Sequence, residues 1–199
     1  MTLIAVSPLS QLAQQLEHHR PSHVVTLTSG DVPALPESDA MRRLVLTFND
    51  ITQPREGMVA PDTSHVQALL GFVRAWPKNA PLLIHCYAGI SRSTAAAYIA
   101  ALALNPQSDE AGLANELRKR SPSATPNIRL IEIADEILGR NGRMAAAIQS
   151  IGRGAEAFEG QVFSLPVRVL AHLKNPHGNR AASARAVPRH GAGRNNPSS

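Results

Sequence analysis

Residues 81–104 of this 199-residue chain read PLLIHCYAGISRSTAAAYIAALAL. An apolar run leads to Cys86, the only cysteine, Arg92 follows six residues later, and an Ala-rich segment comes next. The apolar run predicts a buried strand at residues 81–85, and the Ala-rich segment predicts a helix at residues 93–104. The single thiol is therefore expected in a short loop between a strand and a helix.

A loop of this kind favours anion binding. Its backbone N–H groups point at one spot next to a helix N-terminus, and the helix dipole adds to their positive field. Gly89 permits a tight bend, and Arg92 can donate two hydrogen bonds to one phosphate group. The same field favours the thiolate form of Cys86, which would then be a nucleophile aimed at phosphorus. The alternative is a free cysteine that packs as a small core residue.

Strands and helices alternate along the rest of the chain. Short β-branched or apolar runs predict strands at residues 3–6, 23–29 and 43–48, with a loop at 30–39. Helical spacing of apolar residues predicts helices at residues 8–16, 109–119 and 143–158. A further helix is predicted to begin after Asp62, its N-cap, and to end in a turn at Trp76-Pro77, and another is predicted from Pro126 onward. The fold class predicted is α/β, with a mostly parallel central sheet flanked by helices.

Composition limits the function classes. One cysteine excludes an intramolecular disulfide and a cysteine-rich metal site. The first basic residue is Arg20 and the longest apolar run, residues 95–104, is too short to span a bilayer, so a cytoplasmic protein without a membrane segment is expected.

The C-terminal residues 175–199 contain four Arg and no acid. Without those arginines the net charge of +5 falls to +1. Their composition predicts a basic, disordered tail, with nucleic-acid or acidic-surface binding as the alternative, and no specific nucleic-acid binding is expected.

The string HCYAGISRS, residues 85–93, resembles the Cys-x5-Arg signature of the protein tyrosine phosphatase superfamily, and its AGISRS ending is similar to the dual-specificity branch. Two further segments resemble that branch: LTFNDI at 46–51, and LRKRSPSATPN at 117–127 followed by a helix. The resemblance covers about residues 24–138. It implies a cysteine-dependent phosphatase domain, which we place at residues 1–174. No Trp-Pro-Asp string and no counterpart of the phosphotyrosine-depth loop is present.

The resemblance also implies residue roles. Cys86 would be the nucleophile, and Arg92 would bind the phosphate and the transition state. Ser93 would stabilise the departing thiolate. His85 would position Cys86 or simply pack at the strand end, and Asn127 would brace the loop or serve only its own helix start. The backbone amides that would bind phosphate belong to Tyr87, Ala88, Gly89, Ile90, Ser91 and Arg92.

A general acid is needed for the leaving oxygen. Asp50 follows a strand and, in a parallel sheet, should lie at the same edge as Cys86. Asp62 already has a role as an N-cap, and Asp39 precedes its strand and so lies at the wrong end. Asp50 is therefore the predicted acid, in a two-step reaction through a phosphocysteine that needs no metal and no cofactor.

The predicted substrate is a phosphotyrosine or phosphoserine/threonine protein, or a small phosphomonoester. The variable loop positions Tyr87, Ala88, Ile90 and Ser91 are uncharged, which favours a singly phosphorylated substrate over a phosphoinositide. Two other functions stay open: a rhodanese-type sulfurtransferase, and an inactive module that recognises phosphorylated partners. Asp50 and Ser93 favour phosphate chemistry over the first, and retention of Cys86 and Arg92 argues against the second.

Overall fold

The computed structural model describes residues 2–36 and 41–167. The predicted tail at 175–199, the end of the predicted domain and Asp39 lie outside the described residues. The strands are β1 (Leu3–Pro8), β2 (His23–Thr28), β3 (Arg42–Thr47), β4 (Leu82–Cys86) and β5 (Phe163–Pro166). The helices are the 3-10 helix η1 (Leu9–Gln11), α1 (Leu12–His19), α2 (Thr63–Ala75), α3 (Arg92–Leu104), α4 (Glu110–Arg120), α5 (Ile128–Ile137) and α6 (Arg143–Ser150).

The five strands form one sheet in the order β3-β2-β4-β1-β5. The first four are parallel, and β5 pairs antiparallel with β1. The register places Pro8 opposite Cys86, and Thr26 opposite His85, so the carboxyl ends of β1, β2 and β4 meet at one edge. The predicted α/β class with a mostly parallel sheet is confirmed.

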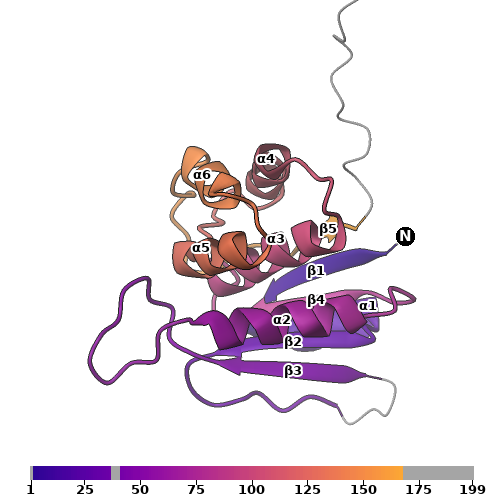
Figure 1. The fold of residues 1–199 in the computed structure, drawn as a ribbon. Coiled ribbons are helices and arrows are strands. Elements are labelled where there is room, and N and C mark those ends of the chain that lie inside the picture. The colour runs from indigo at the N-terminus through magenta and orange to yellow at the C-terminus, as the bar shows by residue number, and fades with distance from the viewer. Residues whose placement is uncertain (1, 37–40, 168–199) are drawn as a thin grey trace, which may run out of the picture.

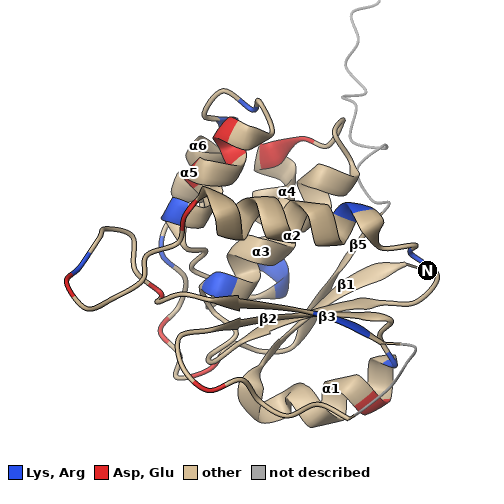
Figure 2. Ribbon diagram, turned by 60° about the horizontal axis from the view of Figure 1, so that its bottom comes forward, with Lys and Arg blue, Asp and Glu red and all other residues tan. Residues whose placement is uncertain are grey.

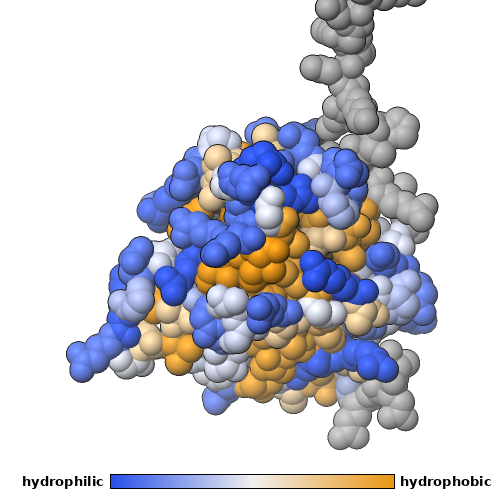
Figure 3. Space-filling view, viewed as in Figure 1, coloured by the Kyte–Doolittle hydropathy of each residue, from blue (hydrophilic) through white to orange (hydrophobic). Residues whose placement is uncertain are grey.

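Helices cover both faces of the sheet. Figures 1 and 2 show α1 on one face and α2 to α6 on the other. Side chains of a strand alternate between the faces: Leu83 packs with Val24 on the α1 side, whereas Ile84 and Val25 belong to the larger core. In Figure 3, apolar surface shows between α2 and α5, which are in contact.

Two helices bracket the carboxyl edge. Helix α2 is capped at its start by Asp62, as predicted, and the Asp62 side chain accepts hydrogen bonds from the N–H groups of Ser64 and His65. The helix ends at Ala75, and its C-cap Trp76 precedes Pro77 in the predicted turn. Helix α3 starts at Arg92 and is buried from Arg92 to Leu102, because its small alanine side chains let the sheet and three helices pack closely around it. The Cys86 loop, residues 86–92, is therefore fixed at both ends by buried elements.

Some predicted boundaries were wrong. The helix predicted at 143–158 ends at Ser150, since Gly152 has a φ of +63° and the chain then runs without regular structure to Val162. The helix predicted at 8–16 begins as η1 at Leu9, because Pro8 still belongs to β1. Pro126 precedes the N-cap of α5 instead of lying in its first turn. Strand β5 was not predicted.

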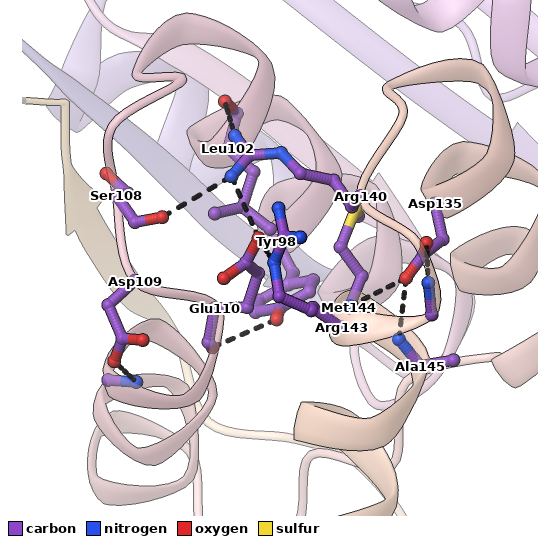
Figure 4. Close-up of polar contacts among 12 residues, drawn as sticks. Tyr98, Leu102, Ser108, Asp109, Glu110, Asp135, Arg140, Arg143, Met144 and Ala145 are labelled. Carbon is purple, nitrogen blue, oxygen red and sulfur yellow. Dashed lines mark hydrogen bonds and ion pairs between the residues drawn. The ribbon is translucent and has the colours of Figure 1, made fainter.

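A buried ion-pair network joins α4 to the turn between α5 and α6 (Figure 4). Nη1 of Arg140 lies 2.9 Å from Oε1 of Glu110, and its Nη2 donates to the carbonyl of Leu102 in α3. Arg143 donates to the same Glu110 oxygen at 3.1 Å, and the Tyr98 hydroxyl donates to the Glu110 carbonyl. The Glu110 carboxylate thus connects α4 to α6 and to the turn before it, and Arg140 and Tyr98 extend the network to α3.

Arg140→Met should lower the free energy of unfolding by about 3 kcal/mol, because it leaves a buried carboxylate without its closest cation. Urea denaturation measures the change. The control is Arg153→Met, whose ion pair with Glu156 is exposed, and little change is expected there. Equal effects of the two substitutions would show that the buried network adds nothing to stability.

Candidate active site

The Cys86 loop connects β4 to α3 and turns sharply at Gly89. Gly89 has a φ of +71°, and a Cβ there would lie 2.8 Å from the backbone nitrogen of Pro8. Glycine is therefore required at this position. Sγ of Cys86 accepts a hydrogen bond from the Gly89 N–H at 3.3 Å and lies 3.1 Å from Oγ of Ser93. The Gly89 N–H and the Ser93 hydroxyl are thus both within hydrogen-bond distance of the sulfur.

Arg92 is the first residue of α3 and is 6% exposed. Its Nη1 donates to the carbonyl of Phe48 at 3.1 Å, which directs the guanidinium along the carboxyl edge of the sheet. Its buried Nε makes no hydrogen bond to any described residue and lies 3.9 Å from Oδ2 of Asp50. A buried cationic donor of this kind is available for an anionic ligand.

A cavity of about 450 Å³ opens onto the thiol. It lies between the Cys86 loop and the loop that follows β2, and Asp50 is outside its lining. A pocket of this size can hold a small ligand. The residues that line it are Leu9, Thr26, Leu27, Thr28, Ser29, Gly30, Asp31, Pro33, His85, Cys86, Tyr87 and Arg92.

Asp50 lies at the predicted position, just beyond the end of β3 and in contact with the Cys86 loop. Its Oδ1 accepts hydrogen bonds from Oγ of Ser91 at 2.8 Å and from Nδ2 of Asn127 at 2.7 Å. The side chain is 35% exposed. The carboxylate is therefore within reach of the loop but is held at its flank by two donors.

Asp62, the other described candidate, is committed to capping. Its Oδ1 accepts from the hydroxyl of Ser64 at 2.6 Å and from two backbone N–H groups of α2. The hydrogen bond from the Ser64 hydroxyl, with smaller contributions from His65, holds the pKa of Asp62 below its usual value. These contacts engage the Asp62 carboxylate at the start of α2.

Asn127 is not confined to its own helix start, although its side-chain contacts are with the Asp50 segment and not with the Cys86 loop. Its side-chain oxygen caps α5 by accepting the Leu130 N–H, while its amide group donates to Asp50 and to the Ile51 carbonyl. The segment before it also contacts the Cys86 loop, since Thr125 N–H donates to the Ile90 carbonyl at 2.9 Å. The strand, acid and helix-start segments of the predicted resemblance thus meet at one place.

Arg118 holds this arrangement from behind and was missed by the sequence reasoning. Its two terminal nitrogens donate to the carbonyls of Pro122, Ala124, Ile151 and Gly152. It therefore ties the loop that precedes Asn127 to the segment that follows α6. The only signal in the sequence was the basic run RKR, which does not show which arginine turns inward.

His85 lies at the end of a chain of polar contacts across three strands. Nε of Arg43 donates to Oγ1 of Thr26 at 3.0 Å, and that hydroxyl lies 2.8 Å from Nε2 of His85. Because Thr26 accepts from Arg43, its own proton is free to be donated to Nε2 of a neutral His85 ring. Burial, together with the Arg43 charge, lowers the pKa of His85 to about 4. The imidazole next to Cys86 is therefore neutral at pH 7.

This lowered pKa predicts a pH-dependent stability. The unfolded chain binds a proton at His85 near the ordinary value of 6.5, whereas the folded chain does not until about 4. Stability is then fully present above about pH 6.5 and falls as the pH drops toward 4. From about pH 7.5 to about pH 5 the loss due to His85 should be about 2 kcal/mol.

His85→Gln should remove this part of the pH dependence, because its side-chain amide can still face Thr26 but does not titrate. Urea denaturation of both proteins at the two pH values measures the difference. Parallel losses in wild type and variant would show that His85 is not the titrating group.

Among the residues that the structure describes, no group of three or more His, Cys, Asp or Glu side chains is placed to hold a metal ion. Over the same residues, none of the helices combines the length and the apolar character that a bilayer crossing requires.

No protein-family model matches the chain, and no curated protein matches its sequence. Solved structures do match. The structure of DUSP15 is 16% identical, with 75% of this chain and 92% of that chain covered at a TM-score of 0.57. Human DUSP28 is also 16% identical, with 71% of this chain and 95% of that chain covered at a TM-score of 0.54. The chain has the fold of the dual-specificity phosphatases.

A third matching structure is named as a phosphatase-like interacting protein. The human tyrosine phosphatase-like serine/threonine/tyrosine-interacting protein is 17% identical, with 68% of this chain and 87% of that chain covered at a TM-score of 0.51. Identities this low establish the fold, and the function has to be argued from the residues of the site.

Proposed function

We propose that this protein is a cysteine-dependent phosphatase of the dual-specificity type that hydrolyses phosphomonoesters through a phosphocysteine. The single observation that carries the proposal is the convergence of Cys86, Ser93, Arg92 and Asp50 on one loop at the carboxyl edge of a parallel sheet. That edge is where ligands bind in such sheets. The catalytic domain is proposed to comprise residues 1–174.

In the first step, the Cys86 thiolate attacks phosphorus and forms an S–P bond, while the bond from phosphorus to the leaving oxygen breaks. Arg92 and the amides of residues 87–92 neutralise the charge on the phosphoryl oxygens, which is the main demand of phosphoryl transfer. Protonated Asp50 gives its proton to the leaving oxygen. For this transfer the carboxyl group turns from Ser91 and Asn127 toward the cavity, as its partial exposure allows.

In the second step, water attacks phosphorus and the S–P bond breaks. The Asp50 carboxylate takes the proton from the water, and inorganic phosphate is released. Ser93 stabilises the departing thiolate, because its hydroxyl is already 3.1 Å from Sγ. The neutral His85 adds no positive charge of its own beside the sulfur and fixes the end of β4 through Thr26.

The proposed substrate is a phosphorylated protein or a small phosphomonoester. A panel tests this: phosphotyrosine and phosphoserine/threonine peptides, a phosphoinositide, a nucleotide and phenyl phosphate, with release of inorganic phosphate as the readout. Turnover of a singly phosphorylated substrate supports the proposal. Phosphopeptide binding without turnover would indicate a recognition module instead, and transfer of sulfur from thiosulfate to cyanide would indicate a rhodanese-type enzyme.

A further inference from the structure

Six large apolar side chains are exposed among the described residues: Val32, Val45, Met58, Val59, Tyr87 and Phe158. Val45 lies on the outer strand β3. Tyr87 lies on the Cys86 loop and the other four lie on neighbouring loops, and we name the five the apolar rim (Val32, Met58, Val59, Tyr87 and Phe158). Of these five, Tyr87 lines the thiol cavity, and the loops of the other four either border that cavity or donate or accept hydrogen bonds at the Cys86 loop. A ligand that fills the cavity and extends beyond it would therefore meet these loops.

Tyr87 and Val32 border the thiol cavity. Tyr87 follows Cys86 directly, is 63% exposed and lines the cavity. Its carbonyl accepts the Leu9 N–H, which fixes the backbone and leaves the ring at the mouth. Val32 lies between Asp31 and Pro33, and both of these neighbours line the same cavity.

Met58 and Val59 are held beside the predicted acid. The N–H of Val59 donates to Oδ1 of Asn49 at 2.8 Å, and the Val59 carbonyl accepts the Asn49 N–H at 2.7 Å. Asn49 directly precedes Asp50. The loop between β3 and α2 projects from the body in Figure 1, so this pair of contacts brings its returning arm back to the site.

Phe158 comes from a segment far along the chain, residues 151–162, that crosses the Cys86 loop. Gly160 N–H donates to the Ala88 carbonyl at 2.8 Å, and a Cβ on Gly160 would lie 2.6 Å from the Gly89 carbonyl oxygen. Glu159 accepts from the Ser10 hydroxyl on the other side. Phe158 is 85% exposed and lies two positions before Gly160, the residue that contacts the Cys86 loop.

The charge around the rim identifies the kind of ligand. Apart from the Cys86 loop, which contains Arg92, the loops that carry the rim are residues 29–33, 50–62 and 153–160. They contain the acidic residues Asp31, Asp50, Glu56, Asp62, Glu156 and Glu159 but only two basic ones, Arg55 and Arg153. An apolar surface that binds anionic lipid would carry basic residues instead. An acidic polypeptide would likewise be repelled, whereas apolar side chains on both sides of a phosphorylated residue fit.

We propose that the apolar rim selects phosphotyrosine polypeptides whose residues next to the phosphotyrosine are apolar and not acidic, with Phe158 as a specificity residue. This rests on the proposed function of the Cys86 site. The phosphate would bind in the Cys86 loop, and the phenyl ring would lie against Tyr87, Leu9 and Pro33 of the cavity wall. The side chains that flank the phosphotyrosine would contact Phe158 and Val59 of the rim.

The test uses the full chain and three substrates: a phosphotyrosine peptide flanked by leucine and valine, the same peptide flanked by glutamate, and phenyl phosphate. We expect kcat/KM for the apolar peptide to exceed that for the acidic peptide by at least about tenfold. Phe158→Ala should lower kcat/KM for the apolar peptide, relative to kcat/KM for phenyl phosphate, by about 5- to 20-fold. This is the range expected for the loss of one aromatic contact, and most of the change should lie in KM.

Val45→Ala is the matched control, because Val45 is exposed but lies outside the rim, and this ratio should not change. Failure of the proposed function would appear as no hydrolysis of any substrate, phenyl phosphate included. The rim proposal alone is overturned if phenyl phosphate is hydrolysed but the acidic peptide is preferred, if Phe158→Ala leaves the ratio unchanged, or if a lipid phosphate in anionic vesicles is a better substrate than the apolar peptide.

Discussion

Cys86→Ser should reduce phosphate release by a factor on the order of 10⁵ or more on every substrate, because a serine hydroxyl is hardly ionised at neutral pH and cannot replace the thiolate nucleophile. Binding of an unreactive phosphate analogue such as tungstate should persist. The proposed anion site consists of the backbone turn at Gly89 and the buried Arg92, and the substitution leaves both residues in place. Activity assays and tungstate titration of the same preparation measure both quantities.

The chain offers its own control for this result. Cys86 is the only cysteine, so iodoacetate can alkylate one thiol at most. Incorporation of one carboxymethyl group should match the loss of activity mole for mole, and tungstate bound beforehand should protect the thiol. Near wild-type turnover of the serine variant would exclude the covalent mechanism. Loss of both turnover and tungstate binding would mean that the sulfur is needed for the anion site itself.

Local patterns were enough to predict the framework of the site. The apolar run before Cys86 specifies a strand, the Ala-rich run after it specifies a helix, and the Cys86 loop lies between them. The strand and the helix are both buried over most of their length. Asp50 was placed at the same edge as Cys86 by one argument, that parallel strands end together. The structure agrees, since Asp50 lies within 3.9 Å of Arg92. The catalytic roles of these residues remain predictions.

The parts that were missed depend on long-range pairing. Strand β5 has four residues and contains Pro166, so its sequence carries little strand signal, and it forms only because the edge of β1 is available. The contact of Arg43 with Thr26, and of Thr26 with His85, follows from the register of β2, β3 and β4. The packing of Gly160 on the Cys86 loop joins residues about seventy positions apart, and the glycine alone does not reveal its partner.

Asp50→Asn should lower kcat on phenyl phosphate by roughly 10²–10⁴, because phenoxide is a poor leaving group that needs a proton as it departs. On p-nitrophenyl phosphate the loss should be much smaller, since that leaving group departs as a stable anion. Asp50 must start protonated, so the variant should also lose the basic limb of the kcat profile against pH. An asparagine can still accept from Ser91 and Asn127, so the loop should keep its shape and the effect should reflect proton transfer.

Asp62→Asn is the matched control, because it makes the same chemical change at a carboxylate that caps α2. Asparagine caps a helix about as well as aspartate, so kcat on both aryl phosphates and the pH profile should stay close to wild type. The comparison of the two variants on the two leaving groups isolates the acid from any general effect of removing a negative charge. If the dependence on the leaving group appeared in the Asp62 variant and not in the Asp50 variant, the acid would be misassigned. Cys86 and Arg92 could then still form the phosphate site, because their geometry does not rest on Asp50.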